Sequence, residues 1–176
     1  MGRLKRTVAL VGMMGAGKSS LGRRLAAALE VPFCDADAEI EAAAGCSIND
    51  IFDRYGETAF RDGERKVIAR LLNEAPHVLA TGGGAFADER IRENIKACAL
   101  SVWINVPVEV LVSRVSRRDT RPLLRNGDPQ EILTRLLAER EPIYSQADLV
   151  VTGEDGPHGT SVQRIVDALK ERSMLE

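Results

Sequence analysis

No run of apolar residues in the sequence is long enough to span a bilayer, and no signal-peptide pattern is present. The net charge is only −2, so nothing indicates an overall attraction for nucleic acid or for an anionic membrane. The three cysteines lack metal-ligand spacing, and the two histidines have no catalytic context. We therefore expect reduced, partly buried thiols, structural histidines and a cytoplasmic protein.

Internal repeats, low-complexity tracts and linkers are also lacking. The 176 residues are enough for one compact domain, and 44% hydrophobic with 28% charged residues is an ordinary globular composition. We predict a single domain over residues 1–176. A monomer is expected, although no sequence feature determines the oligomeric state.

Five short apolar runs alternate with helical patterns along the chain. The runs are continuously apolar, as in strands that are covered on both faces. This alternation predicts an α/β fold with a parallel sheet and right-handed crossovers. The predicted strands are Thr7–Val11, Val31–Cys34, His77–Ala80, Leu100–Ile104 and Leu149–Val151.

The segment Gly12–Ser19 follows the first predicted strand and precedes a helical pattern. It has the form G-x-x-x-x-G-K-S, in which backbone N–H groups close around phosphate oxygens. Lys18 would supply charge to the terminal phosphates, and the Ser19 hydroxyl would be a Mg²⁺ ligand. The alternative is a glycine-rich turn that binds nothing.

A carboxylate at the end of another strand is the usual partner for the metal ion in such a site. The apolar run Val31–Cys34 ends in Asp35, which we predict to support Mg²⁺ directly or through water. Asp37 follows two residues later and is a candidate to bind the molecule that accepts the phosphate. Its alternative role is to cap the helix over residues 38–44, and the two roles do not exclude each other.

Glycine and arginine residues provide further candidates. Gly82, Gly83 and Gly84 follow a predicted strand and allow a ligand to approach the backbone closely. Arg61 and Arg140 read individually as ordinary surface arginines, and their spacing does not show whether they converge. The basic segment 116–128 is interrupted by proline and glycine, which indicates either a mobile lid over the phosphates or a solvated loop.

Together these motifs resemble the shikimate kinase family over nearly the whole chain. The resemblance rests on several motifs in order. They are the P-loop Gly12–Ser19, Asp35-Ala36-Asp37, Phe60-Arg61 with Glu64, the glycine triplet Gly82-Gly83-Gly84, and two later motifs. Those later motifs are Arg121-Pro122-Leu123-Leu124 and Arg140-Glu141-Pro142-Ile143-Tyr144. The P-loop alone is shared by a vast superfamily, whereas the full set in this order is far more specific.

The resemblance implies a three-layer nucleoside-monophosphate-kinase-like fold whose five parallel strands have the order 2-3-1-4-5. It implies transfer of the ATP γ-phosphate to the 3-hydroxyl of shikimate, in the route to chorismate and aromatic amino acids. One Mg²⁺ ion would accompany ATP. Shikimate and ATP would be the only partners, with shikimate-binding helices at about residues 37–73.

The resemblance also assigns roles to individual residues. Asp37 would bind the shikimate hydroxyls and act as the base or orient the hydroxyl; Arg61 and Arg140 would clamp the carboxylate. The glycine triplet would approach the substrate through its backbone. Arg114 would stack near adenine, and Arg121 would reach the ATP phosphates and assist catalysis together with Lys18. The full set of ATP-binding residues would be Gly15, Ala16, Gly17, Lys18, Ser19, Ser20, Arg114 and Arg121.

Two other functions are compatible with a P-loop. A related small-molecule kinase, such as a gluconate kinase, would use the same P-loop and lid without needing Asp37, Arg61 and the glycine triplet. A non-catalytic nucleotide-binding switch would bind ATP without acceptor-dependent turnover. The lid motif and the two aspartates favour the kinase.

Overall fold

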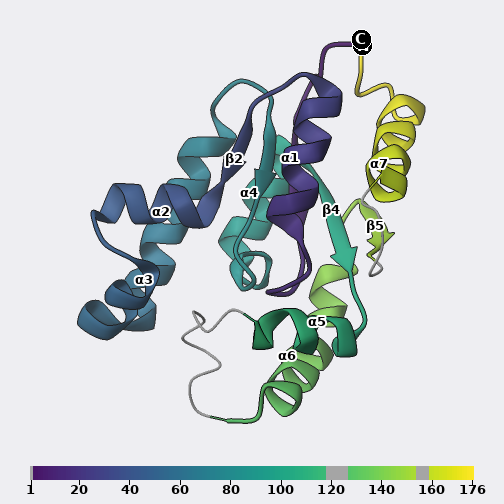
Figure 1. Cartoon of the computed structure of the whole chain (residues 1–176). Coiled ribbons are helices and arrows are strands. Elements are labelled where there is room, and N and C mark those ends of the chain that lie inside the picture. Colours follow the sequence, from purple (N-terminus) through teal and green to yellow (C-terminus); the bar gives the residue numbers. More distant parts are fainter. Residues whose placement is uncertain (1, 118–126, 154–158) are drawn as a thin grey trace.

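The computed structural model describes residues 2–117, 127–153 and 159–176 (Figure 1). Five parallel strands form one sheet in the order β2-β3-β1-β4-β5. This confirms the predicted α/β class, strand direction and strand order. The strands are β1 (Thr7–Val11), β2 (Phe33–Asp35), β3 (Val78–Ala80), β4 (Ala99–Asn105) and β5 (Leu149–Thr152).

Helices cover both faces of the sheet (Figure 1). Helices α1 and α7 pack together on one face, and α3 packs with α4 on the other, which gives the three layers expected. Helices α5 and α6 pack against each other beyond the carboxyl end of β4. The bounds are α1 (Lys18–Leu29), α2 (Ala36–Ala44), α3 (Ile48–Leu72), η1 (Ala85–Ala87), α4 (Glu89–Cys98), α5 (Val108–Ser116), α6 (Pro129–Tyr144) and α7 (Gly159–Glu171).

The second strand begins two residues later than predicted because α1 ends in a left-handed C-terminal cap that also includes Val31. Glu30 adopts a left-handed conformation with φ 56°, and the Val31 amide donates to the Ala26 carbonyl over 3.0 Å. Val31 therefore completes the end of the helix. The strand then starts at Phe33 and extends to Asp35.

Helix α3 is interrupted by a kink at Gly56. Gly56 has φ 84° and ψ 173°, a non-helical conformation that favours glycine. The helix therefore bends there. Its first part lies beside α2, and its second part, after Gly56, packs on α4 (Figure 1).

The core is centred on the inner strands of the sheet. All five residues of β1 are buried, as expected for a strand with helices on both faces. Trp103 is also in the core, with its ring centroid 5.7 Å from that of Tyr144. His77 is buried directly before β3, where its Nδ1 lies 2.9 Å from the Ala75 carbonyl.

The cysteines are free, and two of them are half-buried as predicted. Cys98 is exposed, which corrects the expectation that all three would be partly buried, because it is the last residue of α4. Among the helices of the described residues, none has the length and apolar character needed to cross a membrane.

Candidate functional site

A cavity of about 370 Å³ lies at the carboxyl ends of the central strands. This edge of a parallel sheet is where ligands bind in open α/β folds. Most of the residues predicted for nucleotide, metal and acceptor binding meet here. The described lining residues are Gly15, Gly17, Lys18, Ser19, Ser20, Arg23, Asp35, Asp37, Thr81, Gly82, Gly83, Arg114, Val115 and Arg117.

The P-loop has the conformation that its glycines allow. Gly15 and Gly17 have φ values of 80° and 88°, and α1 begins immediately afterwards at Lys18. The Lys18 ammonium is buried and donates to the carbonyls of Gly12 and Met13 over 2.7 and 2.8 Å. The positive end of α1 and this ammonium therefore lie at one loop, an arrangement suited to an anion.

Ser19 and Asp35 meet as the sequence predicted. The Ser19 hydroxyl donates to Asp35 Oδ2 over 2.7 Å. Within residues 2–117, 127–153 and 159–176, no three His, Cys, Asp or Glu side chains are grouped to hold a metal ion. One hydroxyl and one carboxylate are hard oxygen donors, which suits Mg²⁺ that completes its shell with water and phosphate.

Asp35, and not Asp37, caps α2. Its Oδ1 accepts from the backbone amides of Asp37 and Ala38 at 3.0 and 3.4 Å. The alternative role predicted for Asp37 is therefore wrong, because β2 runs directly into α2 and places the cap two residues earlier. Asp37 lies in the first turn of the helix and lines the cavity.

Each glycine of the triplet faces a different part of the site. A Cβ atom on Gly82 would lie 2.9 Å from Asp37 Oδ1, and one on Gly83 would lie 3.0 Å from the Met14 amide nitrogen. A Cβ atom on Gly84 would lie 2.5 Å from Arg61 Nη2. The triplet therefore packs against an acidic side chain, the P-loop backbone and a guanidinium in turn.

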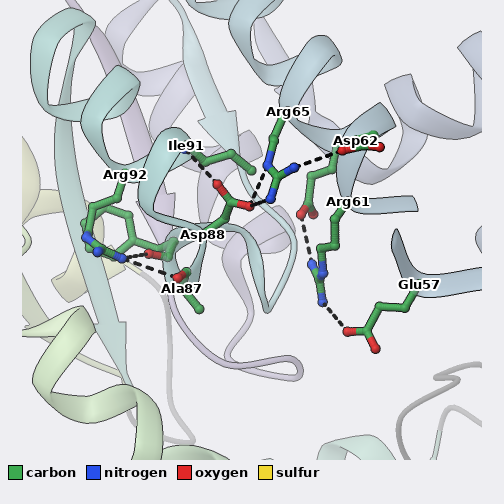
Figure 2. Close-up of polar contacts among 10 residues, drawn as sticks. Glu57, Arg61, Asp62, Arg65, Ala87, Asp88, Ile91 and Arg92 are labelled. Carbon is green, nitrogen blue, oxygen red and sulfur yellow. Dashed lines mark hydrogen bonds and ion pairs between the residues drawn. The ribbon is translucent and has the colours of Figure 1, made fainter. Parts of the chain in front are cut away.

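Arg61 lies over Gly84 and is held by carboxylates of its own helix. Its Nη1 donates to Glu64 Oε1 over 2.8 Å, and its Nη2 lies 3.7 Å from Glu57 Oε1 (Figure 2). Glu64 is 1% exposed, and its Oε2 has no partner among the described residues. Burial raises the pKa of Glu64 above 4.5 against the opposing effect of Arg61, and Asp37 raises it further.

Arg140 and Tyr144 approach the same triplet from α6. Arg140 Nη1 and the Tyr144 hydroxyl donate to the Gly83 carbonyl over 3.0 and 2.6 Å. Burial raises the pKa of Tyr144 above 10.0, so the phenol stays a donor. Arg61 and Arg140, 79 positions apart in sequence, thus lie against neighbouring glycines.

Helix α5 lines the cavity beside the P-loop. Arg114 Nη1 donates to the Gly15 carbonyl over 3.2 Å, and Val115 packs 3.0 Å from where a Cβ on Gly15 would lie. Ala16 is buried within the P-loop, and its amide donates to the Met13 carbonyl. Arg121 and most of the predicted lid lie outside the described residues.

The sequence did not identify several residues of the site. Arg23 lines the cavity, and no motif marked it. Thr81, directly before the glycine triplet, and Arg117, within the basic segment 116–128, also line the cavity but were not singled out as site residues. Glu64 and Tyr144 were quoted only within motifs. The signal for Glu64 was its position three residues after Arg61, where a helix brings side chains together.

Comparison with known proteins gives one family. The shikimate kinase family model matches residues 14–170. A shikimate kinase of Paramagnetospirillum magneticum is 58% identical over 168 residues, covering 96% of this chain and 86% of that protein. The structure of the Acinetobacter baumannii shikimate kinase in complex with shikimate has a TM-score of 0.92 at 37% identity, covering 95% and 94% of the two chains.

The gluconate kinase alternative receives less support. A gluconokinase from Sinorhizobium meliloti has a TM-score of 0.56 at 18% identity, covering 97% of this chain and 99% of that chain, which shows a shared fold alone. The family model, the sequence relatives and the structure agree over most of the length. The chain belongs to the shikimate kinase family.

Proposed function

We propose that this site transfers the γ-phosphate of ATP to the 3-hydroxyl of shikimate, giving shikimate 3-phosphate and ADP. This reaction belongs to the biosynthesis of chorismate and aromatic amino acids. The observation that carries the residue assignment is the convergence of Arg61 and Arg140 on Gly84 and Gly83. Gly82 of the same triplet faces Asp37, and the P-loop lies against Gly83.

The two arginines would hold the carboxylate of the acceptor. A guanidinium presents a planar fork of donors that matches a carboxylate, which a lysine ammonium does not. Arg140 is 9% exposed, so solvent would screen its contact with the substrate only weakly. Residues 37–73, which include Asp37 and Arg61, would form most of the shikimate-binding segment.

Asp37 would contact the hydroxyl that reacts. The hydroxyl oxygen forms a bond to the γ-phosphorus, the bond from that phosphorus to the β,γ-bridging oxygen breaks, and ADP leaves. The hydroxyl proton passes to the Asp37 carboxylate, either before or during transfer. Because phosphoryl transfer depends mainly on alignment and charge stabilisation, fixing the hydroxyl is itself a large part of the catalytic role.

The donor side would be formed by the P-loop and its surroundings. Backbone amides of Gly15, Ala16 and Gly17 would surround the phosphates, with Lys18, Ser19 and Ser20 following at the start of α1. Lys18 would turn from the Gly12 and Met13 carbonyls to the terminal phosphates. Arg114 would lie near adenine, and Arg121 would act from the lid.

Ser19 and Asp35 would hold one Mg²⁺ ion together with ATP, Asp35 directly or through water. When bound, the ion would neutralise charge on the phosphate oxygens. Asp35 is suited to this role because the α2 amides already fix its Oδ1 while Oδ2 lies at the Ser19 hydroxyl. We further propose a cytoplasmic monomer that binds small molecules.

An acceptor panel tests the assignment. ADP release would be measured by a coupled assay with ATP, Mg²⁺ and either shikimate, gluconate or a nucleoside monophosphate. We expect turnover with shikimate alone. Turnover with gluconate would support the related kinase, and ATP binding without any acceptor-dependent ADP release would support a nucleotide-binding switch.

A further inference from the structure

Helix α3 contacts the segment 84–88, which begins at the last glycine of the triplet, at two points. Arg61 lies against Gly84, and Arg65, one helical turn later, reaches Asp88 (Figure 2). Arg65 Nε and Nη2 lie 2.7 and 2.6 Å from Asp88 Oδ2. The two arginines project from the same helix toward the two ends of one five-residue segment.

The Arg65–Asp88 pair is more constrained than an ordinary surface ion pair. The Asp88 side chain is 9% exposed, and its Oδ1 accepts from the Ile91 amide at the start of α4 over 3.2 Å. Burial by itself would raise the pKa of Asp88, but the hydrogen bonds from Arg65 and Ile91 outweigh it and lower the pKa. Arg65 is also held by Asp62 on its own helix, at 2.8 Å.

The segment between Gly84 and Asp88 is held by hydrogen bonds within it and from Arg92. It forms the short helix η1, in which the Ala87 amide donates to the Gly84 carbonyl and the Asp88 amide to the Ala85 carbonyl. Arg92 Nη1 adds a hydrogen bond to the Phe86 carbonyl over 2.8 Å (Figure 2). A shift of α3 relative to Asp88 would therefore change the contact between Arg61 and Gly84.

We propose that Arg65 and Asp88 form a positioning pair for Arg61, the residue assigned to the substrate carboxylate. The pair touches neither substrate and acts by fixing the distance between α3 and the glycine segment. This role differs from that of Glu64, which contacts Arg61 directly. The inference rests on the proposed function, because it assumes that Arg61 binds the acceptor.

Steady-state kinetics of four variants test whether the pair positions Arg61. The variants are Arg65→Gln, Arg65→Lys, Asp88→Asn and the double variant Arg65→Gln/Asp88→Asn. Asn is a good N-cap residue, so Asp88→Asn removes the charge while preserving the cap of α4. We expect Arg65→Gln and Asp88→Asn each to raise the KM for shikimate about fivefold, with little change in kcat or in the KM for ATP. Arg65→Lys retains the charge and should recover part of the loss.

The double variant shows whether Arg65 and Asp88 affect the KM for shikimate through their mutual contact or independently. If the residues act together, it should raise the KM for shikimate no more than the stronger single variant. The matched control is Lys96→Ala, because Lys96 lies on α4, outside the segment 37–73, and donates to Gln146 Oε1 over 2.9 Å at an exposed site. We expect that variant to have wild-type kinetics.

Three outcomes would overturn the proposal: an unchanged KM for shikimate, equal rises in both KM values, or single effects that multiply in the double variant. Calorimetric titration with shikimate gives a second readout that needs no turnover, and thermal melting identifies any variant that does not fold. If Asp88→Asn fails to fold, Arg65→Gln with recovery by Arg65→Lys decides alone. Failure of the proposed function is distinguishable, because the wild type would then show no shikimate-dependent ADP release.

Discussion

Replacing Gly84 with alanine would test the acceptor site with one methyl group. Gly84 has φ −101° and ψ −3°, which alanine adopts without strain. The added Cβ would lie 2.5, 2.7 and 2.9 Å from Arg61 Nη2, Nη1 and Cζ, all inside van der Waals contact. The guanidinium must therefore move, and because it is the end of a flexible side chain, the fold can accommodate the change.

We expect the Gly84→Ala substitution to weaken the binding of shikimate. Displacing Arg61 would remove the charge-assisted contact proposed between its guanidinium and the substrate carboxylate, and such a contact is worth about 1.5–3 kcal/mol. This corresponds to a roughly ten- to hundredfold rise in the KM for shikimate. The KM for ATP should stay near the wild-type value, because no P-loop atom is among the three nearest to the added Cβ.

Gly63→Ala is the matched control for this experiment. Gly63 lies within α3, and a Cβ there would meet nothing within 4 Å. It should leave both KM values unchanged and stabilise the fold slightly, since alanine favours a helix by roughly 1 kcal/mol over glycine. A Gly84→Ala enzyme whose KM for shikimate stays within about twofold of wild type would refute the placement of Arg61.

Three further variants test other parts of the site. Asp37→Asn should reduce transfer by about 10²–10⁴-fold while ATP binding, measured by calorimetry, is largely preserved; an equal loss of ATP affinity would contradict an acceptor-side role. Chelation of divalent cations should abolish ADP release, and Ser19→Ala should raise the Mg²⁺ concentration needed for half-maximal activity; an unchanged requirement would exclude Ser19 as a ligand. Glu64→Gln should change the pH dependence of stability. The folded-state pKa of Glu64 is raised above 4.5, so the folded wild type binds the Glu64 proton more tightly than the unfolded chain does. The free energy of unfolding of the wild type therefore falls as the pH rises from the unfolded-state pKa of Glu64 through its folded-state pKa. Denaturant unfolding at a series of pH values should therefore show the variant gaining stability relative to wild type as pH rises, and a difference independent of pH would contradict the shift.

Local sequence patterns predicted the α/β class and the proximity of the P-loop to Asp35. Glycines followed by Lys18 and Ser19 specify a loop whose conformation depends on neighbouring residues, and Asp35 directly follows an apolar run. Because the carboxyl ends of parallel strands share one edge, these residues had to lie close together. Sequence spacing and sheet topology therefore both place the P-loop residues close to Asp35.

The acceptor half depends on contacts that no local pattern encodes. The approach of Arg61 and Arg140 to neighbouring glycines follows from the packing of α3 on α4 and of α6 on η1. Burial of Glu64 was equally hard to predict, since charged residues are seldom fully buried unless paired. The cap at Asp35 depended on β2 and α2 following each other without an intervening loop.

Gly83 gives the two halves of the site a common wall. Its backbone lies against Met14 of the P-loop, while its carbonyl accepts from Arg140 and Tyr144 of α6. If binding of one substrate displaced this residue, the contacts on both sides would change, and the binding free energies of the two substrates would be coupled. Such coupling is reciprocal: the factor by which ATP changes the dissociation constant of shikimate equals the factor by which shikimate changes that of ATP. In that case each substrate would be an effector for the binding of the other.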